Sequence, residues 1–191
     1  MIPARPRSAF LAAVALAALA GCAAVDTLFD DPPPPVCPRV GVVPDAERVT
    51  RFRPGPGRDI LDIRHTAEIV AVRSVCDSDF AKDGSGVTTM ALAVTVAVER
   101  GPADAERRGT LAYFVATPQF YPRPEGRQTF EMAFAFEGNM GRIEVTDAPV
   151  EITLPFSAEQ TGRDFEVVVG FSLTPEELTY NRSQRPAERA Q

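Results

Sequence analysis

A two-residue alternation of large and small side chains dominates residues 88–100. Large apolar residues fill its even positions from 90 to 98, and small or polar residues fill the odd ones. Successive side chains of a β-strand point to opposite faces, so the pattern predicts a strand with one buried face. The same alternation recurs in residues 130–136 and 165–173. A chain that repeats this pattern needs two such faces packed against each other.

Further apolar runs bounded by turn formers predict additional strands at 36–43, 60–76, 111–117, 143–145 and 150–156. Residues 77–86 are polar and contain glycine, which predicts a loop. Short strands at this spacing favour an all-β fold, an antiparallel immunoglobulin-like β-sandwich. A closed β-barrel is the alternative, because alternation alone does not separate the two architectures.

The C-terminal part of the chain carries a helix start. Thr174-Pro175-Glu176-Glu177 combines a capping threonine, a proline at the first helical position and a glutamate three residues after the cap. We expect a short helix through Asn181 that closes a single domain of residues 36–181. Residues 182–191 lack large apolar side chains and are predicted to be a disordered tail.

The N-terminal segment has the pattern of a signal peptide. Arg5 and Arg7 precede an apolar run, residues 10–20, that is shorter than the roughly 20 residues a membrane-spanning helix needs. A basic start, an apolar stretch of this length and small residues after it are typical of secretion. Residues 1–21 are therefore predicted to be a signal peptide.

The motif Leu19-Ala20-Gly21-Cys22 resembles the lipobox of bacterial lipoproteins. The resemblance implies cleavage before Cys22 and its lipidation with acyl chains such as palmitate, which makes residues 22–35 a lipidated, acidic and proline-rich linker. By the same resemblance, Ala23 in place of an aspartate favours the periplasmic leaflet of the outer membrane over the inner membrane. The membrane is then the first partner of the protein.

Three segments look like a group of uncharacterised periplasmic lipoproteins of Gram-negative bacteria. They are Cys37-Pro38-Arg39-Val40, residues 51–59 and residues 173–178. The resemblance supports the location and implies no activity.

The two remaining cysteines, Cys37 and Cys76, form an even pair in a compartment expected to be oxidising. We predict a disulfide between them. Two buried free thiols are the alternative, whereas a metal-binding pair is disfavoured because no histidine or further cysteine lies at ligand spacing.

Composition and motifs argue against catalysis and against nucleic acid. Without residues 1–21 the chain carries 18 basic residues (20 − 2) and 26 acidic ones, a balance that nucleic-acid binders do not show. His65 is the single histidine, and no hydrolase, zinc-protease or phosphate-binding motif is present in the sequence. We therefore predict a protein that is not an enzyme and that needs no cofactor and no metal.

The aspartates Asp77, Asp79 and Asp83 beside Gly84 are candidate ligands for a calcium ion. An EF-hand needs oxygen ligands at alternating positions, glycine at the sixth position and glutamate at the twelfth. The fifth, sixth and twelfth positions here hold Ala81, Lys82 and Thr88. A solvated loop is favoured.

Two segments are candidates for recognition. Arg51, Arg53 and Arg58 lie among prolines and glycines and suggest an anion or partner site, or else they pair with the local Asp59 and Asp62.

Phe120 and Tyr121 either anchor a partner or cover an end of the sandwich. The sequence thus predicts a lipid-anchored envelope protein with a non-enzymatic binding or structural role, whose partner is an envelope protein or a glycan. A periplasmic carrier of a small ligand or metal is the alternative.

Overall fold

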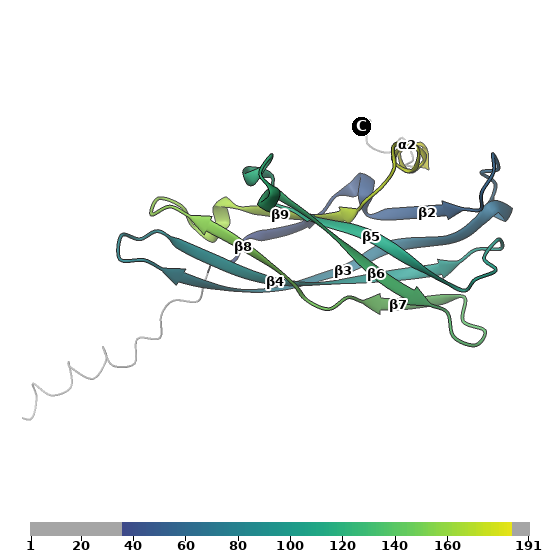
Figure 1. The fold of residues 1–191 in the computed structure, drawn as a ribbon, viewed down its shortest axis with the longest axis horizontal. Helices are drawn as coiled ribbons and strands as arrows, with labels where there is room; N and C mark the ends of the chain where they lie inside the picture. Colours follow the sequence, from purple (N-terminus) through teal and green to yellow (C-terminus); the bar gives the residue numbers. More distant parts are fainter. Residues whose placement is uncertain (1–35, 185–191) are drawn as a thin grey trace, which may run out of the picture. The chain divides into compact units, whose positions relative to one another are not determined.

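The computed structural model describes residues 36–184, which form nine β-strands and one α-helix (Figure 1). The predicted signal peptide, lipidated Cys22, linker residues before position 36 and tail from position 185 lie outside the described residues. In the described residues, no helix is long and apolar enough to cross a membrane.

The strands form two sheets. Sheet A has the order β1 (Arg39–Val42), β9 (Glu166–Phe171), β5 (Arg108–Ala116) and β6 (Arg127–Ala135). Only β1 and β9 run parallel in it; the other neighbours are antiparallel. Sheet B is antiparallel and contains β2 (Arg48–Phe52), β3 (Ile63–Phe80), β4 (Gly86–Arg100), β7 (Arg142–Thr146) and β8 (Val150–Phe156).

Strand β4 organises sheet B. It pairs with β3 along one edge, and with β8 over residues 86–92 and β7 over residues 95–99 along the other. Its even residues Met90, Leu92, Val94, Val96 and Val98 are each 0% exposed, which confirms the alternation predicted from the sequence. Burial of each such side chain contributes about 1.5 to 3 kcal/mol, so this strand supplies much of the stabilising apolar contact.

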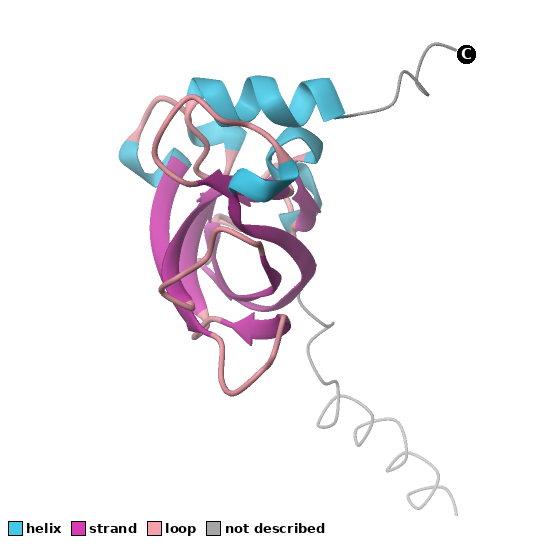
Figure 2. Cartoon of the chain, turned by 90° about the vertical axis from the view of Figure 1, so that its right-hand side faces the viewer, coloured by secondary structure: helices cyan, strands magenta, loops and turns pink. Residues whose placement is uncertain are grey.

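Sheet A packs its own apolar face onto these residues through Leu111, Tyr113, Val115, Val167, Val169 and Phe171. Figure 2 shows the sheets curving around this core with helix α2 (Pro175–Gln184) outside them. The predicted all-β fold with a C-terminal helix is confirmed, and the sheets do not close into one barrel. Short 3₁₀ helices occupy the connections at Pro44–Ala46, Ile60–Asp62, Pro118–Phe120, Pro124–Gly126 and Gly162–Asp164.

The predicted Cys37–Cys76 disulfide is present, with a Cα–Cα distance of 5.8 Å. Cys37 precedes β1 of sheet A, and Cys76 lies on β3 of sheet B. The bond therefore joins the two sheets where hydrogen bonds between strands cannot.

Three sequence predictions need correction. Strand β2 was not expected, and residues 51–52 belong to it rather than to a turn. The predicted loop 77–86 is only a turn at 81–85, because β3 and β4 stay paired up to Phe80 and Gly86. Helix α2 continues to Gln184, beyond the predicted end at Asn181, because contacts with the start of β2 hold its last turn.

Candidate functional site

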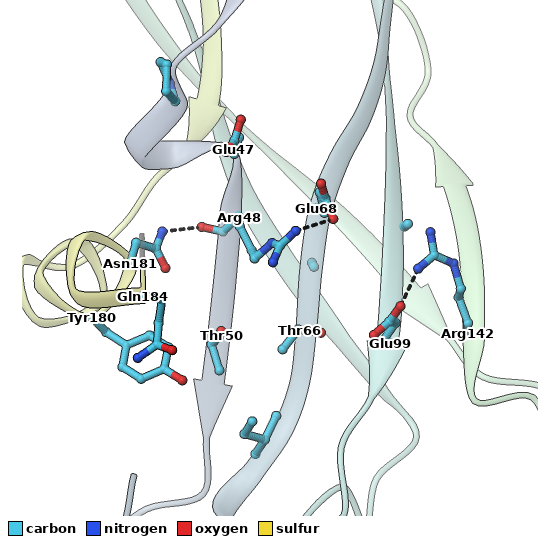
Figure 3. Close-up of a pocket in the computed structure, with 14 residues that line it drawn as sticks. Glu47, Arg48, Thr50, Thr66, Glu68, Glu99, Arg142, Tyr180, Asn181 and Gln184 are labelled. Carbon is cyan, nitrogen blue, oxygen red and sulfur yellow. Dashed lines mark hydrogen bonds and ion pairs between the residues drawn. The ribbon is translucent and has the colours of Figure 1, made fainter. Parts of the chain in front are cut away.

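A groove lies between helix α2 and the outer face of sheet B; we call it the α2 groove (Figure 3). It has a volume of about 650 Å³ and is open to solvent. Its polar lining includes Arg48, Thr50, Thr66, Glu68, Glu99, Arg142, Tyr180, Asn181 and Gln184. They come from β2, β3, β4, β7 and α2, so the groove exists only because the topology places these elements side by side.

Helix α2 is one wall of the groove, and its start is fixed by the predicted capping box. The Thr174 N–H donates to Glu177 Oε2 at 2.8 Å, and the Glu177 N–H donates to Thr174 Oγ1 at 3.2 Å. These bonds satisfy two backbone donors that a helix N-terminus leaves without partners.

The far end of α2 is held by Asn181. Its side-chain amide donates to the carbonyl oxygens of Asp45 at 3.0 Å and Arg48 at 2.6 Å. Between the two ends, the ring of Tyr180 packs edge-on against Phe52 of β2, with 5.2 Å between ring centroids. The wall thus contacts β2 at Arg48 and Phe52, and it contacts the 3₁₀ helix that precedes β2 at Asp45.

The floor of the groove is a row of cross-strand neighbours, Thr50, Thr66, Glu99 and Arg142. Arg142 forms an ion pair with Glu99, and beside this row Arg48 forms one with Glu68 at 2.7 Å. Since these charges are balanced in pairs, the floor presents hydroxyl groups between neutralised ion pairs. Such a surface binds through hydrogen bonds, and its lining contains no serine, cysteine or histidine nucleophile or base.

The three predicted anion-site arginines are all paired with carboxylates. Arg53 contacts Asp62 at 2.5 Å, as the local alternative predicted. Arg51 pairs with Glu177, and Arg58 Nε donates to Glu176 Oε1 at 3.0 Å. Helix α2 therefore supplies the carboxylate partners of two of the three arginines, Arg51 and Arg58.

The rest of this loop is also ordered by hydrogen bonds. Arg58 donates to the carbonyl oxygens of Gly55 at 2.8 Å and Gly57 at 2.7 Å. Asp59 does not pair with the arginines; it accepts from the N–H of Ile60 at 2.5 Å and caps the short helix there. Sequence reasoning missed the long-range pairs because the partners in α2 lie more than a hundred residues away along the chain.

The two aromatic candidates, Phe120 and Tyr121, differ in their exposure to solvent. Phe120 is 7% exposed, packs 5.5 Å from Phe165 between ring centroids and lies under the guanidinium of Arg123 at 4.7 Å. Tyr121, the next residue, is 75% exposed and joined to Pro122 by a cis peptide bond. Phe120 thus covers the end of the sandwich, and Tyr121 remains a candidate for contact with a partner.

His65 is a buried residue of β3 on the side facing the core. It is 5% exposed, and its ring packs edge-on against Phe134 at 4.9 Å between centroids. Burial, together with the nearby positive charges of Arg64 and Arg51, lowers its pKa to about 4. Its Nε2 contacts no hydrogen-bond partner among the described residues.

The three aspartates considered as calcium ligands do not form a common site. Asp77 and Asp79 lie on β3 rather than in a loop, and Asp83 Oδ1 accepts from the N–H and hydroxyl of Ser85 at 3.1 and 2.7 Å. These bonds lower the pKa of Asp83. Over residues 36–184, no cluster of three or more His, Cys, Asp or Glu side chains is arranged to hold a metal ion.

Comparison with known proteins does not give this chain a family. No family model, no curated protein and no solved structure matches it. The lipoprotein resemblance of its N-terminal motif therefore stays a prediction, and function has to be argued from its residues and their geometry.

Proposed function

We propose that this protein is a lipid-anchored periplasmic lipoprotein whose β-sandwich binds another component of the cell envelope and catalyses no reaction. The observation that carries the proposal is the Cys37–Cys76 disulfide. Disulfides persist in oxidising compartments such as the periplasm and are rare in the cytosol. The bond lies just downstream of Cys22, the residue of the lipobox-like motif.

The proposed anchor consists of acyl chains on Cys22. One acyl chain gives only marginal membrane binding, and two or more give stable anchoring. The periplasmic leaflet of the outer membrane is the proposed site, on the resemblance argument for Ala23. We propose an immunoglobulin-like form for the sandwich, and the parallel pairing of its first and last strands, β1 and β9, supports it.

The α2 groove is the proposed contact surface. Its floor offers the hydroxyl of the partly exposed Thr66, next to the buried Thr50, and its helical wall offers the side chains of Tyr180 and Gln184. Hydroxyl, phenol and amide groups between neutralised ion pairs suit a polar, uncharged partner surface such as a glycan or a peptide backbone.

Metabolic labelling with radioactive palmitate tests the anchor. Wild-type protein should carry label and sediment with membranes, whereas Cys22→Ser should be unlabelled and remain in the soluble periplasmic fraction. Label on the Cys22→Ser variant, or none on the wild type, would contradict the proposal.

In vivo photo-crosslinking tests the contact surface. A photo-reactive residue at Gln184 or Tyr121 should give a specific adduct, and the same residue at Ile60, which is also exposed, serves as control. Equal adducts from all three positions would argue against a defined partner site.

A carrier of a small polar ligand is the second candidate. A volume of about 650 Å³ lies within the range of roughly 300 to 1,000 Å³ that ligand sites occupy. A thermal-shift series with soluble glycan fragments separates the candidates, since a carrier gains stability with ligand concentration and Thr66→Val should remove that gain.

A further inference from the structure

The far half of β3, residues 70–80, pairs with β4 on one side and has no strand on its other side among residues 36–184. Strand β2 pairs with β3 only as far as Glu68, whereas β4 pairs with it up to Phe80. A bulge between Ile69 and Ala71 marks the point where the double pairing ends. From there on, among residues 36–184, β3 has a strand neighbour on one side only (Figure 1).

One hydrogen bond shows which residues of this edge direct their backbone N–H and C=O groups away from β4. The Asp147 N–H donates to the Val94 carbonyl at 3.0 Å, so the backbone of Val94 faces away from β3. Directly opposite residues of an antiparallel pair either exchange hydrogen bonds or both direct their backbone groups away from each other. The N–H and C=O groups of Val72, which lies opposite Val94, therefore face away from β4. By the two-residue repeat, Ser74, Cys76 and Ser78 also direct N–H and C=O groups outward.

Arg73, Val75 and Asp77 occupy the outer face of this edge, and all three are exposed. Val75 is 71% exposed, which is unusual for an apolar residue in the middle of a strand. Arg73 and Asp77 form no ion pair with the other described residues, although Asp77 Oδ1 accepts from the Ser78 N–H at 2.9 Å.

We propose that two copies of this chain pair through β3 in antiparallel orientation, about a two-fold axis at Val75. In this register Val75 lies opposite Val75 of the second copy, and Arg73 lies opposite Asp77 of the second copy on both sides of the axis. Asp79 is the diagonal neighbour of the same arginine. These are non-hydrogen-bonded pairs, in which side chains approach most closely, and opposite charges there are stabilising.

The same register aligns the backbone. Residues that direct their N–H and C=O groups outward meet each other, with Ser74 opposite Cys76 and Val72 opposite Ser78 of the second copy. The Ser78 N–H, which donates to Asp77 Oδ1 in the single chain, becomes free for Val72 when the Asp77 carboxylate turns to Arg73 of the second copy. A shift by one residue would place outward groups against inward ones. A shift by two keeps the backbone aligned, and the facing of Val75 with Val75 and of Arg73 with Asp77 selects this register among the aligned ones. The patch is its own complement, as a two-fold interface requires.

Proteins commonly protect exposed edges with charges that repel a second edge. The charges here do the reverse, because antiparallel pairing brings an arginine against aspartates. The pairing would extend sheet B across two molecules, and it goes beyond the proposed function because it requires neither lipidation nor a ligand in the α2 groove.

Charge exchange tests the pairing. Two full-length copies with different epitope tags are expressed together, and detergent extracts are precipitated through one tag. Wild-type copies should co-precipitate. Arg73→Asp in both copies, or Asp77→Arg in both, places like charges opposite each other twice and should lower recovery about tenfold, equivalent to about 1.4 kcal/mol.

The decisive combination is one Arg73→Asp copy with one Asp77→Arg copy. Every facing pair is then again of opposite sign, and recovery should return to the wild-type level. Leu61→Asp in both copies is the control at another exposed apolar residue and should change nothing. The Cys37–Cys76 disulfide, seen as a gel shift on reduction, reports that each variant is folded.

The proposal is wrong if wild-type copies do not co-precipitate. A β3 edge that pairs with a strand of another protein instead would give this result. It is also wrong if the mixed pair is recovered as poorly as each variant with itself.

Discussion

The hydroxyl of Tyr113 on β5 donates a 2.7 Å hydrogen bond to Oδ2 of Asp147, in the connection between β7 and β8. This bond crosses from sheet A to sheet B at the point where the edge of β4 passes from β7 to β8. The Asp147 N–H meanwhile donates to the Val94 carbonyl of β4. Asp147 thus bonds to β4 between its partner strands β7 and β8, and it also links this part of sheet B to sheet A.

Tyr113→Phe should lower the free energy of unfolding by about 1.5 to 3 kcal/mol, the range for a hydrogen bond to a charged group. The ring remains, so its stacking on Phe130 is kept and the change isolates the hydroxyl. Urea unfolding measures the loss. Tyr121→Phe, at an exposed residue, is the control and should differ from wild type by less than about 0.5 kcal/mol.

The pH dependence of stability provides a second test of Tyr113. Burial, and then the bond to Asp147, raises the pKa of its phenol in the folded protein. The unfolded chain therefore loses this proton first, so the stabilisation is complete below pH of about 10 and is lost as the pH rises further. Wild type should lose more stability than Tyr113→Phe between pH 9 and 11; parallel curves would contradict the assignment.

His65 predicts an acid-sensitive fold. With a folded pKa of about 4 against about 6.5 in the unfolded chain, the unfolded state binds more protons between these values. Stability should therefore fall as the pH falls from 6.5 to 4, by up to about 3 kcal/mol.

His65→Gln removes this titration. The difference between the two unfolding curves isolates His65, since it is the only histidine and the carboxylates titrate in both proteins. A variant that follows the wild-type slope above pH 5 would show that folding does not lower the pKa of His65.

The strand pattern and the disulfide could be predicted from the sequence because both depend on residue type at fixed spacing. Alternation along β4 determines which face is buried whatever the partner strand. With Cys22 predicted to carry lipid, Cys37 and Cys76 are the two remaining cysteines, so only one pairing is possible. The helix start likewise needs only Thr174 and Glu177, three residues apart.

What could not be predicted depends on long-range pairing. Strand β2 carries arginines and ends beside a glycine-rich loop, so its local signal indicates a turn; it becomes a strand because β3 offers it hydrogen bonds. The carboxylate partners of Arg51 and Arg58 lie in α2, and the α2 groove combines residues from five elements. None of these neighbours is close in sequence, and no spacing rule connects them.

The contact between Arg51 and Glu177 holds α2 on β2 and predicts a measurable coupling. Both side chains are partly shielded from solvent, at 33% and 14% exposed. Glu177→Gln keeps an acceptor for the Thr174 N–H and removes only the charge. We expect a loss of about 1 kcal/mol in unfolding free energy, smaller in high salt.

Glu176→Gln is the matched variant one residue away. Glu176 is 70% exposed and its partner Arg58 39%, so solvent screens this pair more and the loss should stay below about 0.5 kcal/mol. Equal losses from the two variants would show that the charge of Glu177 is not specific to its pairing with Arg51.

The disulfide makes the strongest prediction for stability. It joins residues 39 positions apart, and closing a loop of this length stabilises by about 3 to 4 kcal/mol on the chain-entropy model. Cys37→Ser/Cys76→Ser should lose about this much in urea unfolding, and dithiothreitol should destabilise the wild type but leave the double variant unchanged. A double variant as stable as the oxidised wild type would mean that the packing of the two sheets alone holds Cys37 beside β3, and the disulfide would then indicate the location of the protein without stabilising its fold.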